Sequence, residues 1–469
     1  MGVTTHWIDE NTFQRHGAVL ACKRFKGTHN YIRIANFLYE INVQYNLKSK
    51  QIVSTVTDNG KNFVKAFKEF GYKIKIPAAL EEEIPIVLEG EIDSEYSNNG
   101  QEDLDEYNDE FDIDFEFRSI EQKDTDVESI IELPKHLRCA SHTLSLLATT
   151  DFTKALKQNP VASKIHHTAM GKCTMLWNMS RRPSTSEKIV DFLGKSLKYP
   201  TPTRWNSLFD ALSNLLVHRE NLNKLMSKLD SNVLFKDVEL NYLEECIDVL
   251  SSIASALDRL QSENECYYGI LMPTLFSLKM RMRMLHERNL RFLNGVVTIL
   301  ITSLENRFKD YFNFSPTVND AIIASCLHPT FKLKWLPKSM SSEEELRFQN
   351  LCNAAIDELV PLEVTSISNS SEDEFFIFNG SNILQQSNTD TELISFFNDK
   401  QKTLDTLNKY PRVKKAFIKF NTSLCSAPVE RLFSFAGFIH SPTRGLLSDK
   451  IFETLVFLKG NKNYQSNNK

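Results

Sequence analysis

The sequence has no paired cysteines, no long apolar run and no secretory signal. Its eight cysteines are scattered, with no Cys-x-x-Cys pair, so neither a zinc ribbon nor a disulfide framework is indicated. No stretch reaches the roughly 18 consecutive apolar residues of a membrane span, so we expect no membrane partner. Residues 1–9 lack the basic and apolar segments of a leader. The 469 residues, 41% of them hydrophobic, are enough for two or three domains with their own cores.

Charge is unevenly distributed along the chain. The net charge of -5 conceals an acidic stretch at 81–132, which holds 21 Asp and Glu against Arg118 and Lys123. The remaining residues are together net basic, which suits a nucleic-acid partner better than the total charge suggests. The acidic stretch contains Asn-Asn-Gly and lacks helical periodicity. It is predicted to be a disordered surface insertion.

The first 80 residues have the pattern of an α/β layer. Alternation at 3–7 and 18–22 predicts a hairpin. Apolar residues three and four apart predict a helix over 31–45. The β-branched run 52–56 predicts a short buried strand, and a helix should follow over 61–69, ending at a glycine. This order of elements predicts a mixed sheet with helices on it.

The rest of the chain is predicted to be mainly helical. A strand is expected at 137–140, and the prolines within 183–203 predict a loop. Continuous apolar stripes over 206–358 predict an all-α block of five to eight helices. A second loop is predicted at 363–391. Near the C-terminus, Pro428 begins one helix and Ser448 caps another.

Two carboxylates stand where chemistry is plausible. Asp58 directly follows the predicted strand, and the carboxyl ends of strands are where α/β sites commonly form. Asp-Asn-Gly is also ordinary turn chemistry. Glu430 flanks an apolar helical stripe, where it could ligate a metal or pair with Arg431 or Arg444. On these residues alone the structural interpretations are the more common ones.

Two further pairs suggest contacts with nucleic acid. Cys139 and His142 are three residues apart near a strand-to-helix junction, but no second pair completes a zinc finger. The histidine could instead approach a phosphate. Arg204 and Trp205 precede a long helix, and the tryptophan could be core or a platform on which a base stacks.

Four motifs occur in the order seen in hAT-superfamily transposases, and the chain resembles that family over almost its whole length. They are Thr-Asp-Asn-Gly-Lys-Asn-Phe at 57–63, Arg-Cys-Ala-Ser-His-Thr-Leu at 138–144, Thr-Arg-Trp-Asn-Ser at 203–207 and Ser-Ala-Pro-Val-Glu-Arg-Leu-Phe-Ser at 426–434. The tail through 447–458 is similar to the family's C-terminal dimerisation region. Each motif is weak alone, but four in order are specific.

The resemblance implies an α/β plus all-α protein. An RNase H-like mixed α/β domain, its first strand missing, would be interrupted by a large all-helical insertion domain. The implied RNase H-like parts are 1–80 and 133–182, separated by the acidic insertion 81–132. The all-α insertion domain would span 183–395, and 396–469 would be the dimerisation region that completes the RNase H-like domain.

The resemblance also implies roles for named residues. Asp58 and Glu430 match the second and third members of an acidic triad that holds two Mg²⁺ or Mn²⁺ ions. The family's Cys-x-x-His element lies near the cleaved phosphate, and its tryptophan stacks on an unpaired base at the transposon end. The matching DNA-binding residues are Cys139, His142, Arg204 and Trp205. The dimerisation residues are Phe452, Leu455, Val456 and Leu458.

The chain also departs from the family pattern. The family's first acidic residue lies on a strand preceding a stretch like Gly2–Asp9, so we expect that carboxylate to be absent and catalysis to be lost. No Cys/His finger is present. We therefore expect a non-catalytic, nuclear, homodimeric or higher-order protein with possible DNA binding and no small-molecule substrate. Two alternatives remain open: an active transposase whose start is wrongly assigned, and a helical scaffold with no nucleic-acid role.

Overall fold

The computed structural model describes most of the chain outside the acidic stretch. The described residues are 1–25, 27, 29–71, 131–201, 206–263, 265–360, 388–422, 426–440 and 447–462. Residues 81–130 of the predicted insertion therefore lie outside them, as do Arg204 and Trp205. Of the second predicted loop, 363–391, only the last four residues are described, and they begin a helix.

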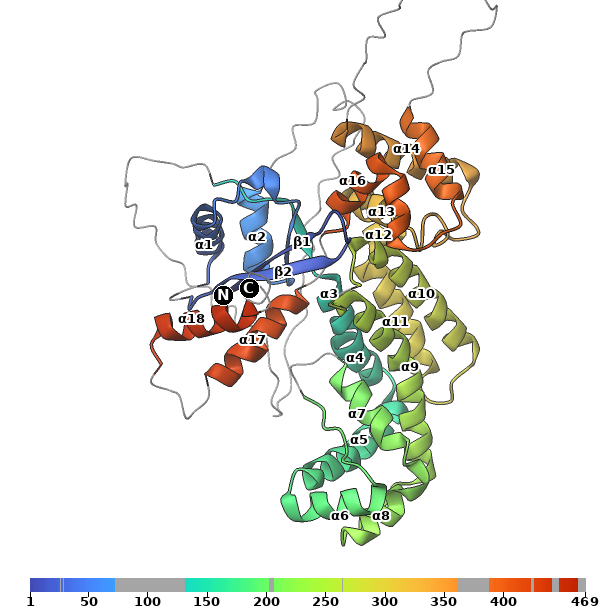
Figure 1. The fold of residues 1–469 in the computed structure, drawn as a ribbon. Helices are drawn as coiled ribbons and strands as arrows, with labels where there is room; N and C mark the ends of the chain where they lie inside the picture. The colour runs from blue at the N-terminus through green and yellow to red at the C-terminus, as the bar shows by residue number, and fades with distance from the viewer. Residues whose placement is uncertain are drawn as a thin grey trace, which may run out of the picture.

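The described fold is mostly helical, with two small sheets (Figure 1). Strands β1 (Gly2–Ile8) and β2 (Arg15–Cys22) form an antiparallel hairpin with a register irregularity between Val3 and Thr4. Strands β3 (Thr55–Thr57) and β4 (His136–Arg138) pair in parallel. The predicted hairpin and the combination of strands with a helical block are confirmed.

The predicted single mixed sheet is not seen among the described residues, where the four strands pair two by two. The predicted strand at 52–56 is also shorter and later in the structure. Residues Ser49–Gln51 form a 3-10 turn, and only Thr55–Thr57 adopt the extended pairing. Strand β3 has only three residues, so it has few backbone groups for pairing, and it pairs with β4. Its Thr55 amide donates to the carbonyl of Lys135, the residue before β4, at 2.7 Å.

Helices α1 (Tyr31–Gln44) and α2 (Lys61–Phe70) pack on each other beside the strands. Asn30 caps α1 by accepting from the Arg33 amide at 2.9 Å. The apolar faces of both helices meet in a small core that contains Ile34, Leu38 and Phe67. Both helices were predicted from their apolar spacing, and both are confirmed.

A long helical body follows. Its helices are α3 (Ala140–Leu146), α4 (Phe152–Lys157), α5 (Pro160–Ser180), α6 (Pro183–Leu193), α7 (Ser207–Leu216), α8 (Leu222–Lys228), α9 (Asp237–Gln261), α10 (Leu271–Glu287), α11 (Asn294–Arg307), α12 (Lys309–Phe312), α13 (Asn319–Cys326), α14 (Ser342–Leu359), α15 (Asn388–Asn398) and α16 (Pro411–Phe420). A five-residue π-helical turn joins α3 to α4.

The helical body is organised around α9. Helices α5, α7 and α10 pack along it, as Figure 1 shows. One buried cluster contains Ile8 and Phe13 of the β1–β2 hairpin and residues between Ala140 and Phe420. Helices α3 to α5 therefore share their core with the later helices. The predicted all-α block over 206–358 is confirmed by α7 to α14. The domain boundaries remain predictions.

The loop predicted at 183–203 is wrong in its first half, because residues 183–193 form helix α6. Pro183 occupies the first helical position, where its missing N–H would have had no partner. Ile189 is buried, which anchors the helix. The helix ends at Gly194, whose φ of 74° is the left-handed conformation that glycine accepts most easily.

The last two helices return to the hairpin. Helices α17 (Ala427–Ile439) and α18 (Asp449–Gly460) lie against β1 and β2, next to the N-terminus (Figure 1). Ser448 caps α18 by accepting from the Ile451 amide. Val456 and Leu432 pack with Val19 in a separate small core. None of the described helices combines the length and apolar character needed to cross a bilayer.

Candidate functional site

Asp58 lies at the carboxyl end of β3, immediately before α2. Its Oδ1 accepts a hydrogen bond of 3.1 Å from the Gly60 amide, which closes a local turn at the start of the helix. Strands β3 and β4 are parallel, and Thr57 pairs with Arg138 in their register. The residues that follow them, Asp58 and Cys139, therefore leave the sheet at the same edge.

Cys139 is fully buried and acts as a hydrogen-bond acceptor at this edge. Its backbone N–H donates to the Thr57 carbonyl at 2.8 Å. Its sulfur caps α3 by accepting from the His142 amide at 3.4 Å. The same sulfur accepts from Ser426, from the backbone amide at 3.3 Å and from the hydroxyl at 3.2 Å. Cys139 thus connects β3, the start of α3 and the start of α17.

Glu430 lies in the first turn of α17 and faces the same place. The Ser426 hydroxyl is 3.3 Å from Glu430 Oε1. Burial raises the pKa of the Glu430 carboxyl, and the charge of Asp58 raises it further, while Ser426 and Arg431 act in the opposite direction. The main cause of the raised pKa is thus burial, and Asp58 adds a smaller contribution of the same sign. The structure brings together Asp58, Cys139 and Glu430, which three separate motifs had singled out.

The acidic pair has the right chemistry for a divalent cation, but it is a small donor set. Carboxylate oxygens are the ligands that Mg²⁺ and Mn²⁺ prefer. A cation held by Asp58 and Glu430 would also offset the burial and the smaller repulsion by Asp58 that disfavour ionised Glu430. In the part of the chain that the structure describes, no group of three or more His, Cys, Asp and Glu side chains is placed to hold a metal ion.

The two histidines near the pair have different surroundings. His142 is half-buried in the first turn of α3, and its backbone amide is bound to Cys139. His136, which we did not single out from the sequence, bonds the Thr57 hydroxyl at 2.8 Å and stacks on Phe67 with centroids 4.4 Å apart. Burial lowers its pKa to about 4, so it is neutral near pH 7.

The predicted base-stacking motif is only partly described. Arg204 and Trp205 lie outside the described residues, so their predicted role stays a prediction. The next residue, Asn206, is held on α9: its Nδ2 donates to the Ala254 carbonyl at 3.0 Å and to Asp258 Oδ1 at 2.6 Å. The motif therefore ends on the central helix of the helical body.

The predicted dimerisation residues separate into two groups. Val456 is 0% exposed and packs inside the chain, and Phe452 is partly buried beside it. Leu455 and Leu458 are exposed, at 37% and 46%. Phe438 on α17 is 81% exposed and extends the apolar surface of the two helices. The outer residues, rather than Val456, are available to a partner.

Comparison with known proteins adds no identification. No protein-family model matches this chain, and no curated protein matches it in sequence.

Proposed function

We propose that this protein is a DNA-binding, self-associating protein derived from a hAT-type transposase, and that it keeps part of the acidic site without cutting DNA. The observation that carries the proposal is the meeting of Asp58, Cys139 and Glu430 at the ends of β3, β4 and the start of α17. These residues belong to three motifs of the resemblance that are distant in the sequence. In this interpretation the two strand pairs are parts of an RNase H-like sheet.

The non-cutting part of the proposal follows from the number of carboxylates. A two-metal mechanism needs ligands that hold both ions and neutralise most of their charge. Asp58 and Glu430 supply two carboxylates at this point. The acidic pair is therefore suited to weak binding of a single Mg²⁺ or Mn²⁺ ion. Such a site would position a phosphate poorly and would not stabilise both the attacking and the leaving oxygen.

DNA binding is supported by charge and by the motif at 203–207. Outside 81–132 the chain has more Lys and Arg than Asp and Glu, so its folded parts attract phosphates. Arg204 and Trp205 would add a cation and a stacking surface, the combination that single-stranded and flipped bases use. A nuclear location is expected from the family resemblance alone.

Self-association is supported by the apolar surface of α17 and α18. Single exposed apolar residues are common on protein surfaces, but on these two helices several large ones occur together. They are Phe433, Phe435, Phe438, Ile451, Leu455, Phe457 and Leu458. A second copy presenting the same surface would cover it in a twofold arrangement. We propose a homodimer as the simplest such assembly.

DNA binding is tested by fluorescence anisotropy of a labelled duplex with an unpaired terminal base, measured over a series of salt concentrations. The proposal expects the logarithm of the association constant to fall linearly with the logarithm of salt concentration, because lysine and arginine release counterions from phosphates. A helical scaffold with no nucleic-acid role predicts no salt-dependent retention at all. That result would remove the DNA-binding part of the proposal and leave self-association to be tested separately.

An active metal-dependent transposase is the second candidate. The observation that favours it is the raised pKa of Glu430 beside Asp58, since perturbed carboxylates are common at catalytic sites. The two candidates differ in one outcome, the cutting of a hairpin-forming DNA end in Mg²⁺ or Mn²⁺. Only an active enzyme would cut it in a way that depends on both Asp58 and Glu430.

A further inference from the structure

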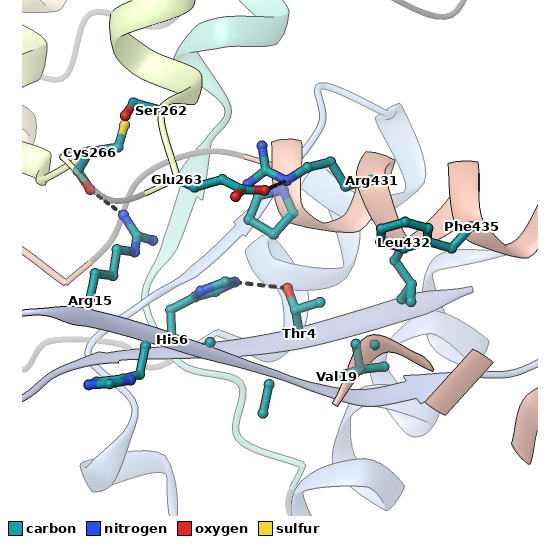
Figure 2. A pocket seen from close by; sticks show the side chains of 15 residues that line it. Thr4, His6, Arg15, Val19, Ser262, Glu263, Cys266, Arg431, Leu432 and Phe435 are labelled. Carbon is teal, nitrogen blue, oxygen red and sulfur yellow. Dashed lines mark hydrogen bonds and ion pairs between the residues drawn. The ribbon is translucent and has the colours of Figure 1, made fainter. Parts of the chain in front are cut away.

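A cleft lies where α17 meets the β1–β2 hairpin, and neither Asp58 nor Glu430 lines it. It has a volume of about 250 Å³ and is enclosed by the β1–β2 hairpin, the segment after α9 and α17 (Figure 2). His6 and Arg15 line it from the hairpin, and Arg431 lines it from α17. Arg431 immediately follows Glu430, so neighbouring residues of α17 face the two sites.

The hairpin holds His6 across the floor of this cleft. His6 pairs with Gly17 in the strand register. A Cβ atom at Gly17 would lie 2.4 Å from His6 Nδ1, so only glycine leaves room for the ring there. The other ring nitrogen, Nε2, shares a hydrogen bond of 3.1 Å with the Thr4 hydroxyl. The imidazole is therefore fixed in one orientation.

Two guanidinium groups reach the cleft from opposite elements. Arg15 donates from Nη1 to the Cys266 carbonyl. Arg431 donates from Nη1 to the Gln261 carbonyl at 3.3 Å, and its Nε lies 3.0 Å from Glu263 Oε1. Both arginines are thus held by the end of α9 and the segment that follows it. Figure 2 shows the contacts of Arg15 with Cys266 and of Arg431 with Glu263.

The electrostatics of the cleft favour an anion. Burial, together with the charges of Arg15 and Arg431, lowers the pKa of His6 to about 4. Arg431 interacts with the charge of Glu430, its neighbour on α17. It also contacts the carboxylate of Glu263, whose side chain is 66% exposed. Exposed ion pairs of this kind are worth little, so a stronger anion can take the place of Glu263 on Arg431.

We propose that this cleft is a binding site for a single phosphate group, held by Arg431 and Arg15 over the His6 ring. The planar guanidinium fork matches phosphate oxygens and has five N–H donors, two of which are engaged in the Arg431 contacts above. A cavity of this size is smaller than the roughly 300–1,000 Å³ of pockets for extended ligands, which favours one phosphate. The group can come from free phosphate or from a nucleic-acid backbone.

The site is tested by following the histidine ring protons of the full-length protein by NMR, with His6 assigned from a His6→Gln variant. Inorganic phosphate is titrated in one arm, and a short single-stranded oligonucleotide is titrated in the other. We expect the His6 resonance to move in at least one arm. Movement with phosphate identifies free phosphate as sufficient, and movement with the oligonucleotide alone identifies the backbone as the source.

Two substitutions at the cleft should change the midpoint of the titration in opposite directions. Arg431→Gln should weaken binding by about tenfold or more, the value of one charge-assisted hydrogen bond. Glu263→Gln should strengthen it, because it removes the competing carboxylate. Arg288→Gln is the matched control, since Arg288 forms a similar exposed pair with Asp248 at 3.0 Å in the helical body, and it should have no effect.

Two results would overturn the proposal. The first is a His6 resonance that moves with neither ligand. The second is an equal loss of affinity in Arg431→Gln and Arg288→Gln, which would indicate general charge attraction. Glu263→Gln keeps the test valid if Arg431→Gln fails to fold, because tighter binding is not a consequence of unfolding. The site does not depend on the Asp58–Glu430 pair, so either proposal can fail without the other.

Discussion

The hydroxyl of Ser426 lies 3.2 Å from the sulfur of Cys139, although 287 residues separate them in the chain. The sulfur also accepts from the Ser426 amide at 3.3 Å. Through this contact the first turn of α17, which includes Glu430, is fixed against the end of β4. The position of Glu430 relative to Asp58 therefore depends on the buried sulfur of Cys139.

The first prediction concerns that thiol. Cys139→Ala removes the sulfur that accepts from the backbone amides of His142 and Ser426, while the Ser426 hydroxyl keeps Glu430 Oε1 as an acceptor. We expect it to lower the free energy of unfolding by about 1–3 kcal/mol, the cost of leaving buried donors unsatisfied. Cys139→Ser keeps an acceptor and should recover part of the loss. Urea unfolding followed by circular dichroism measures both. Equal losses in the two variants would show that the sulfur is not an important acceptor.

The second prediction concerns pH and Glu430. The folded state raises the pKa of this carboxyl above its ordinary value of 4.5. The folded protein therefore holds the proton more tightly than the unfolded chain, and stability is lost as pH rises from 4.5 through the raised pKa. Glu430→Gln removes this loss, so the variant should melt at a higher temperature than the parent at pH 7.

At pH 4 the carboxyl is largely protonated in both states, so Glu430→Gln and the parent should melt at nearly the same temperature. Glu358→Gln, on the exposed side of α14, removes the same charge without the buried neighbourhood and serves as the control. Melting curves at the two pH values make the comparison. A Glu430→Gln variant that is less stable than the parent at pH 7 would contradict the raised pKa of Glu430 in the folded state.

The third prediction separates packing from self-association on α18. Val456 is 0% exposed, so Val456→Ala should cost about 2 kcal/mol of stability, the value of two buried methyl groups with the cavity that they leave. Leu458 is 46% exposed, so Leu458→Glu should leave the melting temperature nearly unchanged. Light scattering coupled to size exclusion should show dimers for Val456→Ala and monomers for Leu458→Glu. A monomeric parent protein would rule out self-association.

The fourth prediction concerns Trp205. If its ring stacks on an unpaired base, Trp205→Ala should weaken binding to DNA with such a base by about 1–3 kcal/mol. Trp205→Phe should lose less, because it keeps an aromatic face. Fully paired DNA should bind all three proteins alike. Anisotropy titrations with the two DNAs would decide, and identical affinities for the unpaired base across the series would place Trp205 in the protein core.

The sequence predicted those parts of the fold that depend on local patterns. The hairpin, helix α1 and the capping of α18 by Ser448 are set by alternation, apolar spacing and side chains within a few residues. Helix α6 was missed because the prolines of 183–203 were interpreted as evidence for a loop. Pro183 instead occupies the first position of the helix, where proline is well tolerated. The single sheet was not found among the described residues because strand pairing depends on partners far along the chain.

The sequence identified several residues of the candidate site but not the contacts between them. Asp58, Cys139 and Glu430 were each ambiguous alone, and only the resemblance put them together. The acceptor role of Cys139 could not be predicted, since its partner Ser426 lies in another motif. His136 was also missed, although its position two residues before Arg138 could have indicated that it lies near the site. The cleft around His6 and Arg431 joins the two ends of the chain, which no local pattern reveals.

One assay tests the central claim most directly. The full-length protein, Asp58→Asn and Glu430→Gln are each incubated with an end-labelled, hairpin-forming DNA end in Mg²⁺ or Mn²⁺, and binding and cutting are both read from gels. The account predicts that the parent protein shifts the DNA, that the label stays on full-length strands, and that neither substitution changes this. Cutting by the parent that disappears in both variants would contradict it and show an active nuclease.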